Sequence, residues 1–227
     1  MQIEKLARLI EQDDYDSWKE LIKKSKEVKE LVLGLYEGIK LPELTQVRFA
    51  LEHKVPLEKI KVFAVPDFNS EQMREIRLGY ENSLTDEQIA MYLNAVYDWQ
   101  QMSQIRHALQ SGLSIKDVKL FASPEFDQYQ MGQLRSAFAI GLEYLQVRVM
   151  ANPKFCIWQM QEIRKGFESG LSVSDVESYA KENIYYTDMR DLRKALEQNS
   201  ENTYKRALIS LEQRQQSLIK LLSDKEQ

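Results

Sequence analysis

The sequence predicts an all-α fold, an α-solenoid of about five two-helix repeats, and three observations support this prediction. Residues recur at a fixed step of 29, each repeat carries two sets of helix start and stop signals, and only 8 glycines and 5 prolines interrupt 227 residues. Two short helices cannot bury both of their apolar faces alone, so neighbouring repeats are expected to stack. One domain is expected over 1–227, with N-terminal cap helices in 1–43, repeats in 44–199 and a C-terminal capping helix in 200–227.

The 29-residue step appears in several registers at once. An arginine occupies one position in six successive repeats: Arg48, Arg77, Arg106, Arg135, Arg164 and Arg193. A small residue follows two positions later each time: Ala50, Gly79, Ala108, Ala137, Gly166 and Ala195. Methionine keeps a third register: Met73, Met102, Met131, Met160 and Met189. The agreement of these registers indicates a repeated structural unit.

The first helix of each repeat begins with the signature of a capping box. Asn69, Asp98 and Asp127 are each followed three residues later by a glutamine. The short side chain accepts from an unpaired backbone N–H, and the glutamine reaches back to the N–H of the cap. In the fourth repeat Cys156 replaces the cap. A helix of about 13 residues is predicted, and a glycine that tolerates a left-handed backbone ends it in three repeats: Gly112, Gly141 and Gly170.

The second helix of each repeat follows after a tight turn. Its caps are Thr85, Ser114 and Ser172, each with an acid or glutamine three residues later. Prolines are expected to end it: Pro66, Pro124 and Pro153. A helix of about nine residues is predicted.

The two ends of the chain depart from the repeat. Helices are expected over 3–11 and 15–24, with Asp13 or Asp14 as the cap of the second, and 24–39 resembles a first helix. One longer helix is expected over 201–223, with a stripe at heptad-like steps: Tyr204, Leu208, Leu211, Gln215, Leu218 and Leu222. The stripe is interpreted as sealing the last repeat, and a coiled-coil dimer is the alternative.

The repeat motif resembles a known family. It is carried by QMREIRLGYENSL, QMSQIRHALQSGL and QMQEIRKGFESGL, together with FASPEFD and YAKENIY, and it covers 44–199. These segments are similar to bacterial 29-residue helical-repeat proteins, many of them encoded on integrative or conjugative elements of gut anaerobes. The family has no assigned activity, so the resemblance implies the repeat fold and no site residues. The sequence departs from the motif at 144–149 and at Cys156, which is expected to weaken the caps of the fourth repeat.

Composition and charge exclude several classes of function. Two histidines and one cysteine leave little material for a zinc site or a nucleophilic site. Cys156 lies at a helix start, where thiols can be reactive, but His53 and His107 belong to other repeats. We therefore expect no enzyme, no catalytic residue, no metal and no cofactor. The beginning of the sequence has no uninterrupted apolar segment, and a cytoplasmic location without membrane contact is expected.

Two sets of residues are candidates for binding. The arginine column listed above could clamp phosphates or carboxylates. The alternative interpretation is structural, with each arginine lying on the neighbouring repeat and pairing there. An aromatic row occurs at the first two positions of successive first helices: Trp99, Tyr129, Trp158 and Tyr186. Exposed aromatic side chains are typical of protein and peptide recognition, although these could also cover the preceding loop.

The sequence therefore predicts a non-catalytic scaffold that binds a protein or peptide through the aromatic row. The alternative function is nucleic-acid binding through the arginine column, as some helical repeat proteins do. The formal charge of −4, spread evenly along the chain, disfavours that alternative. We expect a monomer, with a dimer through 201–223 as the other possibility.

Overall fold

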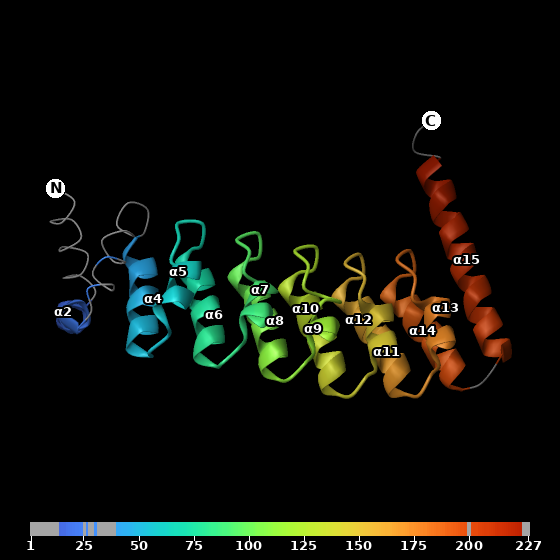
Figure 1. The fold of residues 1–227 in the computed structure, drawn as a ribbon. Helices are drawn as coiled ribbons and strands as arrows, with labels where there is room; N and C mark the ends of the chain where they lie inside the picture. Colours follow the sequence, from blue (N-terminus) through green and yellow to red (C-terminus); the bar gives the residue numbers. More distant parts are fainter. Residues whose placement is uncertain (1–13, 25, 27–29, 31–39, 199–200, 224–227) are drawn as a thin grey trace. The chain divides into compact units, whose positions relative to one another are not determined.

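The computed structural model describes residues 14–24, 26, 30, 40–198 and 201–223, and every regular element in these ranges is a helix (Figure 1). The described part of the chain is therefore all-α, as predicted. The helix expected over 3–11, the cap Asp13 and most of the segment 24–39 lie outside the described residues. Two compact units divide the chain, an N-terminal unit (Met1–Pro124) and a C-terminal unit (Glu125–Gln227).

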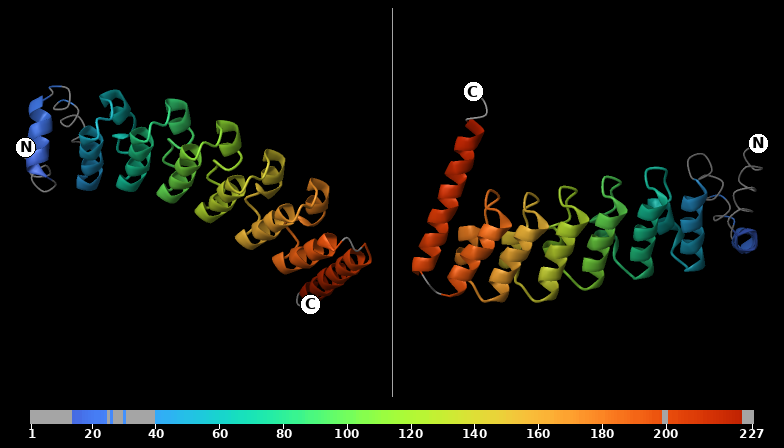
Figure 2. Two further views of the ribbon diagram at one scale, coloured as in Figure 1. Left: turned by 90° about the horizontal axis from the view of Figure 1, so that it is seen from below. Right: turned by 180° about the vertical axis from the view of Figure 1, so that it is seen from behind.

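The N-terminal unit alternates long and short helices. Its long helices α4, α6 and α8 pack in succession, and α2 packs against α4. The short helices α5, α7 and α9 each follow a long helix and pack against it, on one side of the layer of long helices (Figure 2). The bounds are α2 Tyr15–Lys24, α4 Leu41–Glu52, α5 Leu57–Phe63, α6 Ser70–Glu81, α7 Asp86–Ala90, α8 Trp99–Gln110 and α9 Ile115–Val118.

The C-terminal unit continues the same alternation. The long helices α10, α12 and α14 pack in succession, the short helices α11 and α13 pack against them, and α15 packs against α14. The bounds are α10 Gln128–Ala139, α11 Tyr144–Met150, α12 Ile157–Glu168, α13 Val173–Tyr179, α14 Tyr186–Glu197 and α15 Glu201–Ser223.

The long helices reproduce the sequence step. Six of them in the described ranges have 12 residues each and begin 29 residues apart. The core of each unit is formed by the methionine register and by an apolar residue three positions later, as in Met73 with Ile76 and Met160 with Ile163, all fully buried. Burial of side chains of this size contributes about 1.5–3 kcal/mol each, which makes this face the main source of stability.

The capping boxes are confirmed. Asn69 Oδ1 accepts from the Gln72 N–H over 2.9 Å, and Gln72 Oε1 accepts from the Asn69 N–H over 2.9 Å. Asp98 and Asp127 form the same box with their glutamines. At Cys156 one of the two hydrogen bonds of the box remains, in which Gln159 Oε1 accepts from the Cys156 N–H over 2.9 Å.

The second helices are shorter than predicted. They have four to seven residues instead of about nine, as in α9 (4) and α7 (5). After α7 the chain makes a tight turn in which the Tyr92 N–H donates to the Ile89 carbonyl, and Asn94 Oδ1 then accepts the Val96 N–H over 3.0 Å. Asn152 Oδ1 accepts the Lys154 N–H in the same way after α11, so in these two repeats an asparagine turn offers the backbone an alternative to the helix. Pro66, Pro124 and Pro153 lie beyond the ends of α5, α9 and α11 and do not set the last helical residue.

The turn between the two helices of a repeat requires a left-handed residue. Gly112, Gly141 and Gly170 have φ of 90°, 90° and 87°, and the same register holds Lys54 (φ 61°) and Ser83 (φ 63°) in the earlier repeats. Asn199, the last member of this register, lies outside the described residues. A residue with a Cβ is strained in this conformation, so Lys54 and Ser83 occupy places that suit glycine.

Replacing Ser83 with glycine is expected to raise the free energy of unfolding by about 1 kcal/mol, because it removes that strain. Urea denaturation at an unchanged m-value measures the gain. The control is Asn82→Gly, one residue earlier, where φ is −95° and the Asn82 side chain donates to the Leu78 carbonyl over 2.7 Å. The control is expected to destabilise the protein, and a Ser83→Gly variant no more stable than wild type would contradict the strain argument.

The last helix, α15, has the bounds predicted, but its apolar stripe is only partly covered. Leu211 is buried, and Tyr204, Leu208 and Gln215 are half-buried. Leu218 and Leu222 are 59% and 66% exposed, so the expected seal ends near Gln215. The reason is length, since α15 has 23 residues and the neighbouring α14 has 12, and Figure 1 shows the end of α15 extending past α14.

Candidate interaction surface

The arginine column lies inside the helix packing. Arg77 Nε donates to Gln46 Oε1 over 3.2 Å, and Arg106 Nε donates to Glu75 Oε2 over 2.8 Å. Arg193 makes the equivalent bond to Glu162 over 3.0 Å. In all three cases the acceptor lies 31 residues earlier, on the preceding long helix. Each of these bonds therefore joins one repeat to the one before it.

The other end of the guanidinium group binds its own helix. Arg48 Nη1 and Arg106 Nη1 each bond over 2.8 Å to the residue four positions later, Glu52 and Gln110. Arg193 Nη1 does the same to Glu197 over 2.5 Å. Burial acts to lower the pKa of Arg193, but the hydrogen bonds to Glu197 and Glu162 outweigh it, and the pKa is raised. Each of these guanidinium groups is therefore held by charge-assisted or amide hydrogen bonds on its own helix.

Two members of the column are half-buried. These are Arg135 and Arg164. Arg164 Nε lies 3.2 Å from Glu168 Oε1 on the same helix. The acceptor that the register predicts for Arg164 is Gln133, and its side-chain oxygen is buried without a hydrogen bond within the described part of the chain. The arginine column therefore forms a structural ladder in which the bond between Gln133 on α10 and Arg164 on α12 is missing.

The glutamine of the capping box has a second role, which the sequence did not reveal. Gln130 Nε2 donates to the Pro153 and Phe155 carbonyls over 2.8 and 2.7 Å, while its Oε1 serves the cap. Gln72 and Gln159 make the same pair of bonds in their repeats. The signal was the constant choice of glutamine, because a glutamate suffices for a capping box but has no N–H to donate.

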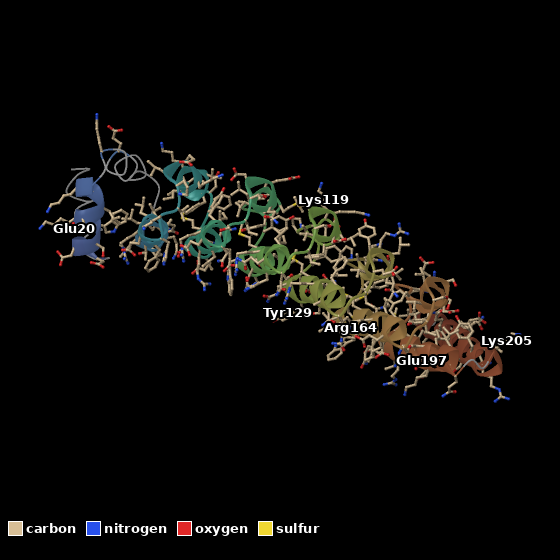
Figure 3. All side chains as sticks on the ribbon, turned by 60° about the horizontal axis from the view of Figure 1, so that its bottom comes forward. Glu20, Lys119, Tyr129, Arg164, Glu197 and Lys205 are labelled. Atoms are coloured by element: carbon tan, nitrogen blue, oxygen red, sulfur yellow. The ribbon has the colours of Figure 1, made fainter. Side chains whose placement is uncertain are left out.

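The aromatic row lies on the surface. Trp99 is 40% exposed at the start of α8, in the N-terminal unit. In the C-terminal unit Tyr129 and Trp158 are 65% and 53% exposed at the second positions of α10 and α12. Tyr186, the first residue of α14, is half-buried. Figure 3 shows Tyr129 and Arg164 on the long-helix side of this unit.

The structure brings Trp158 together with Tyr186 and adds a residue that the sequence analysis missed. The ring centroids of Trp158 and Tyr186 are 6.1 Å apart, and those of Tyr186 and Tyr185 are 4.6 Å apart. Tyr185 is 64% exposed, and the adjacent Tyr186 raises its pKa. The signal was its register, because Tyr185 occupies the N-cap position of α14, where an aromatic side chain cannot cap.

We call Tyr129, Trp158, Tyr185 and Tyr186 the aromatic surface of the C-terminal unit. The residues after Trp158, Gln159 and Met160, are buried, so the helix period turns the indole outward. Three of the four side chains are exposed, Tyr186 is half-buried, and Trp158, Tyr185 and Tyr186 form one tilted cluster. Large aromatic side chains exposed together are the side chains that most often anchor protein partners.

Cys156, His53 and His107 belong to three different long helices or their caps. Cys156 is exposed. His53 Nδ1 lies 2.8 Å from the Phe49 carbonyl and 3.2 Å from Glu81, and His107 Nδ1 lies 2.8 Å from the Ser103 carbonyl. Among the described residues no group of three or more His, Cys, Asp or Glu could hold a metal ion.

No helix in the described ranges is long and apolar enough to cross a membrane. No protein-family model matches the chain, and no curated protein or solved structure shows significant similarity to it.

Proposed function

We propose that the chain is a non-catalytic scaffold, an α-solenoid of about five helix pairs, that binds a protein or peptide partner through the aromatic surface. The observation that carries this proposal is the cluster of Trp158, Tyr185 and Tyr186, together with exposed Tyr129 on the adjacent long helix α10. A folded protein gains nothing by leaving such rings in water, whereas an interface recovers the burial of their surface.

The use of the polar side chains supports the same proposal. The repeated glutamines and most of the repeated arginines form hydrogen bonds between or within repeats, so their polar groups are already used in holding the helices together. The aromatic row varies in type from repeat to repeat, and packing does not require it. A surface that is free to vary on a constant framework is typical of repeat scaffolds.

The burial and pairing of the arginine column disfavour the alternative function, nucleic-acid binding. Arg77, Arg106 and Arg193 are buried and each binds two acceptors, so they do not present a row of charges to phosphates. The net charge of −4 adds no long-range attraction for a polyanion.

Capture of the partner from a lysate of the native host tests the proposal. A tagged wild-type chain is expected to recover a stoichiometric protein whether or not the lysate is treated with nuclease. Trp158→Ala is expected to reduce that recovery by about 30-fold, the loss typical of an interface anchor. The control is Leu145→Ala, which removes an exposed apolar side chain from the short helix α11. Recovery that disappears after nuclease treatment, or that survives Trp158→Ala, would contradict the proposal.

A further inference from the structure

We propose that the last part of α15 pairs with the same segment of a second copy of the chain, with the two helices antiparallel. We call residues 216–223 the distal segment of α15, and every one of them is exposed. This surface is separate from the aromatic surface, so the inference does not rest on the proposed function. Three observations carry it: an apolar face, the packing that this face continues, and the charges around it.

The distal segment has a largely uncovered apolar face. Leu218, Ile219, Leu221 and Leu222 are all between 59% and 67% exposed. At 3.6 residues per turn they lie within about 160° of the helix circumference, and Lys220 lies on the opposite side. Single exposed apolar residues are common on protein surfaces, whereas a contiguous stripe of this width is typical of a helix face that packs against another element. The face therefore has the pattern of a buried surface although it is exposed in the single chain.

The apolar face continues the stripe by which α15 packs on α14. The earlier part of that stripe, from Tyr204 to Gln215, is buried or half-buried. In this part α15 runs back along α14, and Arg214 Nη1 lies 2.7 Å from Oδ1 of Asp188 near the start of α14. The next two positions of the stripe, Leu218 and Leu222, lie beyond the start of α14 (Figure 1). A heptad-like stripe that already packs on one antiparallel helix is suited to a second antiparallel helix where α14 ends.

A second copy supplies that helix in a symmetric arrangement. In a twofold pair, a residue that contacts a given residue of the other chain is matched by the reverse contact. A twofold axis near Lys220 places Leu218 of each chain against Leu222 of the other, so the four leucines pack together. The two α14 helices then lie at opposite ends of the paired segments and leave the contact open. A parallel pair would instead place both α14 helices at the same level, beside the part of the stripe that they already cover.

The charges of the distal segment permit it to pair with itself. A twofold pair brings the segment against an identical one, so charges on the contact face would meet like charges and repel. Lys220 is the only charged residue in 216–223, and it lies opposite the apolar face. Arg214, which precedes the segment, pairs with Asp188 within the chain. The face therefore offers a partner only aliphatic side chains, and a second copy presents the same side chains to it.

The interface is small, so we expect a reversible dimer. The eight residues of the distal segment span about 12 Å of helix. Two such segments bury less than the about 1,200 Å² at which stable interfaces begin, which is the size of weak and transient contacts. Monomer and dimer are therefore expected to exchange, with a dissociation constant between about 10 and 100 µM.

Sedimentation equilibrium of the full chain from about 1 µM to about 1 mM brackets this dissociation constant and tests the pairing. The weight-average mass is expected to rise from the monomer value of 26.7 kDa toward twice that value. Leu218→Gln combined with Leu222→Gln is expected to raise the dissociation constant at least about tenfold. The matched control is Ile209→Gln, which removes an exposed apolar side chain from the opposite side of α15 and is expected to leave the dissociation constant unchanged.

Cysteine cross-linking tests the antiparallel orientation, in a Cys156→Ser background that removes the exposed native thiol. Leu218→Cys and Leu222→Cys chains are incubated in a glutathione redox buffer, separately and mixed. A disulfide requires Cα atoms within about 7 Å, and the antiparallel pair brings position 218 of one chain to position 222 of the other. The mixture is therefore expected to form at least about fivefold more cross-linked dimer than either variant alone.

The outcomes decide the inference without reference to the proposed function. A chain that stays monomeric up to about 1 mM, or a dimer that the two leucine substitutions leave intact, would overturn the pairing. An equal loss with Ile209→Gln would show that the apolar face is not the contact. Cross-linking of either cysteine variant alone as strongly as the mixture would exclude the antiparallel orientation. Trp158→Ala is expected to leave the dimer unchanged, and a dimer that depends on Trp158 instead of the leucines would place the second copy on the aromatic surface. Circular dichroism is expected to show the same helix content in every variant.

Discussion

Replacing Gly166 with alanine is expected to lower the free energy of unfolding by about 3 kcal/mol, the upper end of the cost of overfilling a core. A Cβ at this position would overlap the hydroxyl of Tyr179 and lie 3.2 Å from a methyl of Val176. Tyr179 is fully buried, and its hydroxyl donates to the Glu162 carbonyl over 3.3 Å, so the ring has no room to withdraw. The midpoint of denaturant unfolding at an unchanged m-value measures the loss.

Other repeats of the chain show which second substitution should restore the stability of Gly166→Ala. Gly79 and Gly166 each lie against a tyrosine 13 residues later, Tyr92 and Tyr179, whereas repeats with alanine have a residue without a hydroxyl there. These pairs are Ala50 with Phe63, Ala108 with Phe121 and Ala137 with Met150. Gly166→Ala combined with Tyr179→Phe reproduces the combination of Ala108 and Phe121.

The double variant is therefore expected to recover most of the loss, and a double-mutant cycle gives a coupling of about 2 kcal/mol. Alanine also favours a helix over glycine by about 1 kcal/mol, but both variants carry Ala at position 166, so this gain does not enter the coupling. A double variant as unstable as Gly166→Ala alone would show that the hydroxyl is not what the glycine accommodates.

The helix pattern could be predicted because its signals are local. A capping box lies within four residues, and a left-handed turn needs one suitable residue, so the sequence indicates both directly. The starts of α6, α8 and α10 follow from such signals, and the range of α15 follows from its heptad-like stripe. The early ends of the second helices were not predicted. The turn at Asn94 competes with helix propagation after α7, and a proline in the sequence marks only the last residue that a helix could reach.

The aromatic surface could be predicted only in part, because contacts between repeats are not local. The exposure of Trp158 and Tyr129 is one of two outcomes that the sequence left open, and the contact of Trp158 with Tyr186 spans two helices and depends on their packing. The arginine ladder is similar, since its acceptors lie 31 residues away in the sequence. The exposed end of α15 results from the difference in length between α15 and α14, so it cannot be recognised from the residues of α15 alone.

Replacing Gln130 with glutamate is expected to lower the free energy of unfolding by about 4 kcal/mol, although the two side chains have the same shape. The hydrogen bond of the capping box is kept in this variant, because a carboxylate oxygen can still accept from the Asp127 N–H. The Pro153 and Phe155 carbonyls, however, lose their donors and face a negative charge at a site where Gln130 is 6% exposed. Unpaired buried polar groups cost about 1–3 kcal/mol each, and more when one is charged.

The matched control is Gln128→Glu, the same change two residues earlier on the half-buried first position of α10. There the added charge meets the positive end of the helix dipole and is expected to change stability by no more than about 0.5 kcal/mol. Equal effects of the two substitutions would mean that the bonds to the next loop contribute nothing.

The pH dependence of Gln130→Glu distinguishes lost hydrogen bonds from general disruption. Two carbonyl oxygens and burial raise the pKa of the introduced carboxyl in the folded state above its unfolded value of about 4.3. Between these two pKa values the folded chain binds more protons than the unfolded chain, so stability falls as pH rises and recovers as pH falls. The protonated acid also donates one of the two missing bonds. The difference in unfolding free energy from wild type is therefore expected to narrow by at least about 1 kcal/mol between pH 7 and pH 4. A difference that stays constant would place the damage elsewhere than at the carbonyls of Pro153 and Phe155.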